Sequence, residues 1–145
     1  MPSKSKVCFF FEVNRTSLKD RTRLKRFIEF LFKRERKKLE SLNYIFCSDQ
    51  RVLKINKQFL KHNFFTDIIT FELSESSFTN GEIYISLDRV KDNAKTLGIS
   101  PVTELHRVIF HGALHLCGFK DKTPKDEVIM RKKEDEYLKR YMSFT

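Results

Sequence analysis

The sequence predicts one α/β (α+β) domain over residues 1–145, with about four strands in a mixed sheet and about five helices. Two observations predict this fold. Short segments rich in β-branched and aromatic residues are interspersed with longer segments in which apolar residues recur every three or four positions. No repeat, low-complexity tract or linker divides the 145 residues. Strands interspersed with helices are typical of a sheet covered by helices.

The first half of the chain is expected to contain three strands and two helices. Residues 6–13 and Asn43–Ser48 are rich in strand formers, and so is Thr66–Leu73. The helix from about Ser17 to Glu40 rests on apolar residues at helical spacing, namely Leu24, Phe27, Ile28 and Leu31. A shorter helix is expected to begin after Ser48 or Asp49, either of which can cap it, and to end near Leu60.

The second half begins with a polar Ser/Thr/Asn loop, after which Gly81 is expected to open a fourth strand at 82–86. This strand can form a hairpin with the third. Three helices should follow: Asp88–Leu97, ended by Gly98; Pro101–Cys117, capped by Ser100 and closed by Gly118; and a last helix capped by Thr123 and Pro124 that runs to about Tyr141.

Charge is distributed unevenly along the chain. There are 29 Lys and Arg residues against 19 Asp and Glu residues, for a net charge of +10. The segment 15–39 alone holds eleven basic and three acidic residues: Arg15, Lys19, Arg21, Arg23, Lys25, Arg26, Lys33, Arg34, Arg36, Lys37 and Lys38 against Asp20, Glu29 and Glu35. The expected helix therefore has an apolar face for the core and a basic face for water. Such a face attracts polyanions, so nucleic acid is the leading partner, with an ordinary solvated surface and an acidic membrane surface as alternatives.

Composition also limits the location of the protein. No apolar run approaches the roughly 20 residues of a membrane span, and the first residues lack the apolar centre of a secretory signal. The three cysteines, Cys8, Cys47 and Cys117, lie within apolar patterns and are expected to be reduced core thiols. A cytoplasmic protein without a membrane partner is expected.

The segment 111–121, His-Gly-Ala-Leu-His-Leu-Cys-Gly-Phe-Lys-Asp, carries the clearest chemical signal. Residues four apart lie on one face of a helix, so His111 and His115 can reach the same ion. Gly118 can adopt a left-handed conformation and return Asp121 toward the two imidazoles. The helix is otherwise apolar from Val108 to Cys117 and is expected to be buried, so two core histidines with ordinary hydrogen bonds remain the alternative.

Two His and one carboxylate leave a coordination position open for water, as in catalytic zinc sites. The expected metal ligands are therefore His111, His115 and Asp121, which act in catalysis through the metal. The expected cofactor is one divalent ion, with Zn²⁺ favoured. Iron, manganese and nickel can share a set of two His and one carboxylate.

Several motifs in the same order resemble the YbeY family of metal-dependent endoribonucleases. The family pattern His-Gly-x-Leu-His-Leu-x-Gly-Tyr-Asp-His is similar to 111–121. Its Leu-Asn-x-x-Tyr-Arg and Thr-Asp-Val-Leu-Ser-Phe are similar to 55–60 and 66–71, and Gly-Asp-Ile-x-Ile-Ser is similar to 81–86. The resemblance covers most of the chain. It implies a single-strand-specific endoribonuclease of 16S rRNA 3′-end maturation and ribosome quality control, with rRNA and the ribosomal subunit as partners and no DNA substrate.

The chain departs from the family pattern at two positions. Asp121 stands where the family has a third His ligand, and Lys120 precedes it where the family has Asp. A carboxylate still binds zinc, but its charge weakens the ion as a Lewis acid. Leu60 stands where the family has an Arg associated with catalysis or phosphate binding.

Four nearby side chains are candidates for binding the RNA. Lys61 and His62 follow Leu60 and can contact phosphate in place of the missing Arg, and Lys120 and Lys122 flank Asp121. The RNA is expected to lie between the metal helix and the strand 66–73, and the sequence names no general base.

Two other functions fit the same residues. Zinc metalloproteases also place two His at this spacing, but they use His-Glu-x-x-His, and Gly112 occupies the position of their general base. A non-catalytic RNA- or ribosome-binding module with a structural metal is the alternative of a different class, favoured by the departures at Leu60 and Asp121.

Overall fold

The computed structural model describes residues 4–13 and 18–145. Within these ranges the chain forms the four strands and five helices that were expected. They are β1 (Val7–Phe11), α1 (Arg21–Arg34), β2 (Lys38–Cys47), α2 (Asp49–Leu60), β3 (Ile68–Glu72), β4 (Phe78–Ser86), α3 (Leu87–Leu97), α4 (Pro101–Leu116) and α5 (Pro124–Met142).

The strands form one mixed sheet in the order β1-β2-β4-β3. β1, β2 and β4 are parallel, and β3 pairs with β4 in the antiparallel direction. The mixed sheet and the hairpin of β3 with β4 are therefore confirmed. α1 connects the parallel strands β1 and β2, as a parallel pair requires a long crossover.

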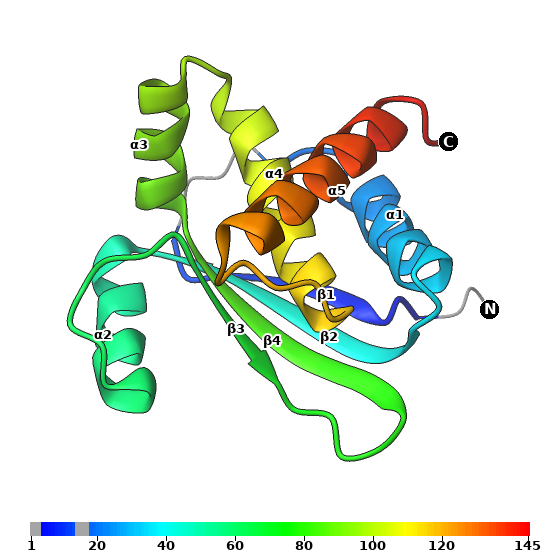
Figure 1. Cartoon of the computed structure of the whole chain (residues 1–145), viewed down its shortest axis with the longest axis horizontal. Helices are drawn as coiled ribbons and strands as arrows, with labels where there is room; N and C mark the ends of the chain where they lie inside the picture. Colours follow the sequence, from blue (N-terminus) through cyan, green and yellow to red (C-terminus); the bar gives the residue numbers. More distant parts are fainter. Residues whose placement is uncertain (1–3, 14–17) are drawn as a thin grey trace.

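The main core lies between one face of the sheet and helices α1, α4 and α5 (Figure 1). Its largest buried side chains are aromatic, and they come from both the sheet and the helices. Tyr44 of β2 also donates its phenol hydrogen to the carbonyl of Ile109 in α4, at 2.8 Å. This buried hydrogen bond fixes the metal helix predicted from the sequence against the centre of the sheet.

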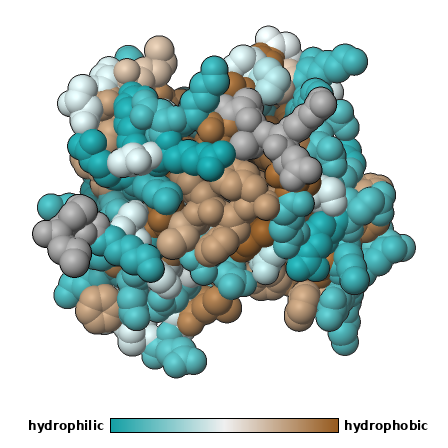
Figure 2. Space-filling view, turned by 180° about the vertical axis from the view of Figure 1, so that it is seen from behind, coloured by the Kyte–Doolittle hydropathy of each residue, from teal (hydrophilic) through white to brown (hydrophobic). Residues whose placement is uncertain are grey.

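The opposite face of the sheet is only partly covered. α2 packs there through Val52 and Ile55 onto Cys47 and Ile69. Seen from this side, the molecule has an apolar area in the middle of its surface (Figure 2). Phe10 of β1 does not belong to the cluster that α2 covers, and it is 51% exposed.

The basic helix is shorter than expected. It was predicted to run from about Ser17 to Glu40, but α1 ends at Arg34 and β2 already begins at Lys38, before the predicted Asn43. The helix ends because Arg36 adopts a left-handed conformation, with φ of 61°, and the amide of Lys37 then donates to the carbonyl of Phe32. Arg15 and Ser17 lie outside the described residues.

Gly81 does not open the fourth strand, because β4 begins three residues earlier, at Phe78. A Cβ on Gly81 would lie 2.7 Å from Cδ1 of Leu116 at the end of α4. The glycine therefore allows the end of the helix to approach the middle of the strand, which is its structural role in place of the predicted turn.

The predicted helix caps are confirmed. Ser48, Ser100 and Thr123 each accept a backbone hydrogen bond at a helix N-terminus, and Thr123 forms a full capping box with Asp126. Gly98 ends α3 with φ of 68°. The caps fix the starts of α4 and α5, the two helices that carry most of the candidate site.

Some of the cations of α1 form hydrogen bonds or ion pairs with other parts of the protein. The guanidinium of Arg23 donates to the carbonyl of Phe144 at 2.7 Å, and Arg26 donates to that of Thr145 at 2.9 Å. Arg34 forms an ion pair with Glu136 of α5 at 2.8 Å. The cations of this helix that remain available to a partner are therefore fewer than its sequence indicates.

Within residues 4–13 and 18–145, no helix is both long enough and apolar enough to cross a membrane. Cys8, Cys47 and Cys117 are free thiols, and the latter two are buried.

Candidate functional site

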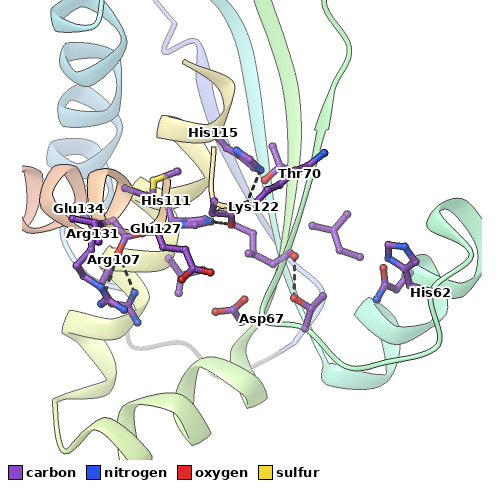
Figure 3. Close-up of a pocket in the computed structure, with 18 of the residues that line it drawn as sticks. His62, Asp67, Thr70, Arg107, His111, His115, Lys122, Glu127, Arg131 and Glu134 are labelled. Carbon is purple, nitrogen blue, oxygen red and sulfur yellow. Dashed lines mark hydrogen bonds and ion pairs between the residues drawn. The ribbon is translucent and has the colours of Figure 1, made fainter. Parts of the chain in front are cut away.

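A pocket of about 1240 Å³ lies among the second half of α4, the first half of α5, the beginning of β3 and the segment after α2. The candidate ligands His111, His115 and Asp121 line it, and so does Lys122 (Figure 3). Asp67 faces them from the segment before β3, and His62 lies across the pocket beside α2. The predicted position of the substrate, between the metal helix and the third strand, coincides with this pocket.

His111 and His115 project from one face of α4, with their ring centroids 5.8 Å apart. Gly118 takes a positive φ of 106° after the helix, and the chain returns so that Asp121 faces both rings. Nε2 of His111 lies 3.2 Å from Oδ2 of Asp121, and Nε2 of His115 lies 4.0 Å from Oδ1. The structure thus brings together the three side chains that the sequence singled out.

The other ring nitrogen of each His is held by an acceptor. Nδ1 of His111 lies 2.6 Å from a carboxylate oxygen of Glu134, and Nδ1 of His115 lies 2.7 Å from the carbonyl oxygen of Phe119. A carbonyl or ionised carboxylate oxygen can only accept, so Nδ1 carries the hydrogen in both rings. In the neutral imidazoles the lone pair is then on Nε2, which faces Asp121 and the pocket.

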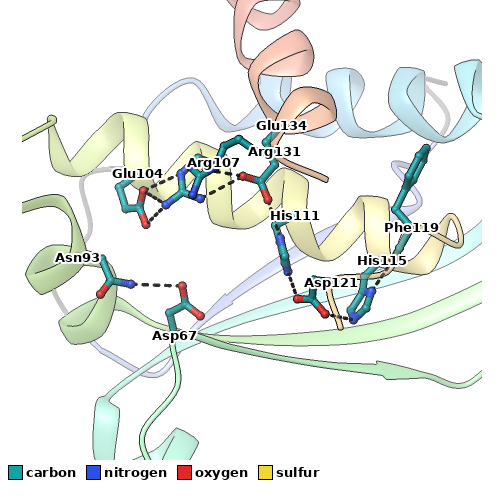
Figure 4. A network of polar contacts seen from close by, with 10 residues as sticks. All are labelled: Asp67, Asn93, Glu104, Arg107, His111, His115, Phe119, Asp121, Arg131 and Glu134. Atoms are coloured by element: carbon teal, nitrogen blue, oxygen red, sulfur yellow. Dashed lines mark hydrogen bonds and ion pairs between the residues drawn. The ribbon is translucent and has the colours of Figure 1, made fainter. Parts of the chain in front are cut away.

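Glu134 connects this site to a buried ionic network (Figure 4). Its second carboxylate oxygen accepts from Arg107 at 3.0 Å, and Arg107 also donates to Glu104 at 2.9 Å. Glu104 is fully buried and Glu134 is 3% exposed. Burial raises the pKa of Glu134, but its hydrogen bonds and charge interactions with His111 and Arg107 outweigh burial, so its pKa is lowered and it stays ionised.

The same contacts act on His111. Burial alone lowers the pKa of its imidazole, whereas the hydrogen bond to Glu134 and the charges of Glu134, Asp121 and Asp67 raise it, and the net shift is upward. The ring therefore lies in a strongly electronegative site. A divalent cation would relieve the same accumulation of negative charge that a proton does.

Asp67 is a second carboxylate of the pocket. One of its oxygens accepts from the side-chain amide of Asn93 in α3 at 3.3 Å, and its backbone carbonyl accepts from Ser86 at 2.9 Å. Both contacts hold the residue where β3 begins, with the carboxylate directed into the pocket (Figure 3). The motif 66–71 contained this residue, but no feature of the sequence separated it from its neighbours.

The donor chemistry fits a metal ion better than the donor spacing does. Ligands at 2.0–2.1 Å from a tetrahedral zinc are about 3.3 Å apart, so the His111–Asp121 distance fits and the 4.0 Å between His115 and Asp121 is longer. Accordingly, no group of three or more His, Cys, Asp or Glu side chains in the described part of the chain is already close enough to hold an ion. Asp121 follows a helix end and its side chain is 40% exposed. The ligand set stays a prediction.

The four expected RNA contacts divide into two groups. His62 and Lys122 line the pocket, whereas Lys61 and Lys120 do not. Lys61 ends α2 in a left-handed conformation, with φ of 56°. Leu60 also lines the pocket, so the position at which the family has Arg faces the site here as an apolar surface.

Sequence reasoning missed Glu134 and Arg107. A signal for Glu134 does exist, because it occupies the same face of α5 as the buried residues Met130, Tyr137 and Tyr141. A carboxylate at an apolar-face position of an otherwise highly charged helix indicates a buried partner.

Several known proteins are similar to this chain in sequence and in fold. The family model described as endoribonuclease YbeY matches residues 11–142. The endoribonuclease YbeY of Cytophaga hutchinsonii is 46% identical over 137 residues, which cover 93% of this chain and 96% of that protein. That of Flavobacterium psychrophilum is 41% identical over 133 residues, covering 92% and 94%. Among solved structures, that of TM1509 from Thermotoga maritima is similar with a TM-score of 0.65 and 29% identity, over 94% of this chain and 89% of that one.

Proposed function

Since this chain belongs to the YbeY family of endoribonucleases, we propose that it is a metal-dependent endoribonuclease that cleaves single-stranded RNA in 16S rRNA 3′-end maturation and ribosome quality control. The observation that carries the proposal is the pair of imidazoles whose Nε2 atoms face Asp121 in the pocket while their Nδ1 atoms are held from behind. Such an arrangement is typical of metal ligands supported by a second layer of hydrogen bonds.

His111, His115 and Asp121 would hold the ion, and Zn²⁺ is the favoured one because two of the three donors are imidazoles. When bound, the ion supplies Lewis-acid polarisation of a phosphoryl oxygen and lowers the pKa of water. The residues of the chain supply the rest. Glu134 orients His111, and the carbonyl of Phe119 orients His115.

Asp67 is the general base in this proposal. One carboxylate oxygen is held by Asn93, which leaves the other to take a proton from the attacking water as a new oxygen–phosphorus bond forms. The bond between phosphorus and the leaving ribose oxygen then breaks, and that oxygen takes a proton from solvent.

Lys122 and Arg131 line the same pocket, and in this proposal they bind phosphates of the RNA. Leu60 cannot donate to phosphate, so it offers an apolar contact to a base instead. The RNA is rRNA in a ribosomal subunit, and the reaction takes place in the cytoplasm.

The metal ligands are tested by metal analysis of protein purified without chelator. The wild type should retain about one equivalent of metal, and Asp121→Ala and His115→Ala should lose most of it because each removes one of three donors. Asp135→Ala, which removes an exposed carboxylate of α5, is the matched control. A full equivalent retained by Asp121→Ala would exclude Asp121 as a ligand.

The reaction is tested with the same proteins and a labelled single-stranded RNA. Cleavage should be lost in His115→Ala, and Asp67→Asn should lower the turnover rate by roughly 10²–10⁴-fold while the metal content stays unchanged. Equal cleavage by wild type and His115→Ala would remove the metal from the mechanism.

A further inference from the structure

A second groove, of about 910 Å³, lies on the side of the molecule where α1 ends and where β1, β2 and β4 begin. No residue lines both this groove and the pocket of the candidate metal site. Its charge is one-sided, since six of its lining side chains are cations: Lys6, Arg26, Lys33, Arg36, Lys37 and Lys38. The single carboxylate in the lining is Glu29.

Most of these cations are not neutralised within the protein. In the described part of the chain, the side chains of Lys6, Lys33, Arg36 and Lys37 form no ion pair, and all four residues are exposed. Glu29 accepts a hydrogen bond from Ser5 at 2.8 Å instead of pairing with a lysine. Cations held close together in a concave surface without counter-charges repel one another, and a bound polyanion relieves that repulsion.

The backbone of Arg36, and not only its charge, sets this residue apart. It occupies the left-handed position after α1, with φ of 61°, where glycine has no steric cost and the Cβ of any other L-residue is crowded against the following carbonyl oxygen. The chain therefore keeps a long cationic side chain at a position that favours glycine for stability. Retained strain of this kind is expected where the side chain itself has a role in binding.

The groove also offers an aromatic surface. Phe78 lines it at the start of β4 and is 45% exposed, and Nζ of Lys38 lies 5.9 Å from the centre of its ring. Proteins bind single-stranded nucleic acid through cations that follow the backbone and aromatic rings on which bases stack. A groove that combines both features fits RNA better than an acidic peptide, which has no bases to stack.

We propose that this groove is a second RNA-binding site, which holds the backbone of single-stranded RNA outside the metal pocket with a base stacked on Phe78. The inference rests on the proposed function only in that RNA is the substrate. In this proposal, Lys33, Arg36 and Lys37 bind the phosphates of an RNA segment that lies outside the metal pocket. Long RNA would then be held at two places, and short RNA at the metal pocket alone.

The test measures the affinity of the full-length protein for a fluorescent single-stranded oligonucleotide in 0.1 M KCl. All variants are made in a His115→Ala background so that cleavage does not consume the probe. Each phosphate neutralised on a single strand raises the affinity by about 0.7 decades for a tenfold drop in salt. Between a salt concentration of about 1 M and the 0.1 M used here, removing one phosphate-binding cation should therefore weaken binding about fivefold. Arg36→Gly should therefore weaken binding about fivefold and Lys33→Ala/Lys37→Ala about 25-fold, with a smaller salt dependence.

Two controls separate the groove from general charge and from unfolding. Lys91→Ala/Lys95→Ala removes two exposed lysines of α3 that line neither pocket and should change affinity by no more than about twofold. Arg36→Gly should keep or raise the thermal stability, since glycine suits the turn, so its weaker binding cannot come from unfolding. Phe78→Ala should weaken binding about tenfold, as expected for one stacked base.

Equal weakening in the α3 control and the groove variant would reduce the effect to net charge and overturn the proposal, and so would unchanged affinity in the groove variants. Polyglutamate that competes as well as RNA would assign the groove to acidic proteins instead. The nuclease proposal fails on a different measurement, because cleavage that persists in His115→Ala overturns it without any change in groove binding.

Discussion

At the scale of single residues, the site depends on one buried carboxylate that has two partners. Glu134 accepts from His111 and from Arg107, and it is almost fully buried. The contact with His111 selects the tautomer that leaves Nε2 free, and His111 and Arg107 together keep the carboxylate ionised. Glu134 is a positioning residue, because it contacts neither the expected ion nor the substrate directly.

We expect Glu134→Ala to weaken metal binding by about 10–100-fold, the usual effect of removing a hydrogen bond that supports a metal-bound His. Glu134→Gln keeps an acceptor for Nδ1 of His111 and should recover part of the affinity. The measurement is competition with a chromophoric chelator. The control is Glu136→Ala. Glu136 lies on α5 like Glu134, but it pairs with Arg34 of α1. Unchanged metal affinity in Glu134→Ala would show that His111 needs no such support.

The three expected ligands could be predicted because local spacing brings them together. His111, His115 and Asp121 lie within eleven residues, and one helix and one glycine determine their relative positions. Glu134 and Asp67 reach the pocket from other elements, through packing of α5 and β3 that no local pattern encodes. The sequence therefore predicts the ligands but not the residues that orient them or the candidate base.

At the scale of elements, α4 lies unusually close to the sheet at Gly112. A Cβ there would meet Cδ1 of Ile83 at 2.8 Å and Cδ1 of Ile68 at 2.9 Å. This is the position at which zinc metalloproteases have their catalytic Glu. In this fold the position faces the buried sheet rather than the pocket, so a side chain there could not serve a metal-bound water.

The close approach predicts the effect of substitution at Gly112. Gly112→Ala should gain about 1 kcal/mol from the higher helix propensity of alanine. The new methyl group must displace two flexible methyl groups, which opposes this gain. The free energy of unfolding should therefore change by no more than about 1 kcal/mol. Gly112→Val adds two more methyl groups and should lower the free energy of unfolding by about 2–3 kcal/mol through overpacking. Urea unfolding measures both, with Lys95→Val on the exposed face of α3 as the control for β-branching. A Gly112→Val protein as stable as that control would contradict the packing.

Element boundaries could be predicted where a capping residue marks them. Ser48, Ser100, Thr123 and Gly98 all mark helix ends that the structure confirms. The end of α1 was predicted six residues too late, because Arg36 takes the left-handed position without a glycine to mark it. Charged residues also continue without a break through 33–38, so composition does not distinguish the helix from the strand.

At the scale of the whole molecule, α1, α4 and the end of the chain form one aromatic assembly. Phe27 of α1 lies about 5 Å from the rings of Phe110, Tyr141 and Phe144, between centroids. His106 of α4 belongs to the same assembly, with its ring 5.0 Å from that of Tyr141. Burial among these rings disfavours the protonated imidazole, and the stability of the molecule therefore depends on pH.

Burial, with a smaller contribution from the charge of Arg23, lowers the pKa of His106 from 6.5 to about 4. Between these two values the unfolded chain binds a proton at His106 and the native protein does not, so the free energy of unfolding falls as the pH falls. The loss of unfolding free energy begins as the pH falls below about 6.5, and it continues to grow down to about pH 4. From pH 7 to 4.5 the loss should be roughly 2–3 kcal/mol, since one pKa unit corresponds to about 1.4 kcal/mol.

His106→Phe keeps a ring in the assembly and removes the titration. Urea unfolding of both proteins at pH 7 and pH 4.5 isolates the effect, because the other titrating groups are common to both and cancel in the difference. The wild type should lose roughly 2–3 kcal/mol more than the variant over this interval. Equal losses in the two proteins would mean that His106 is protonated in the native state, and the close packing of α1, α4 and the chain end around it would then be wrong.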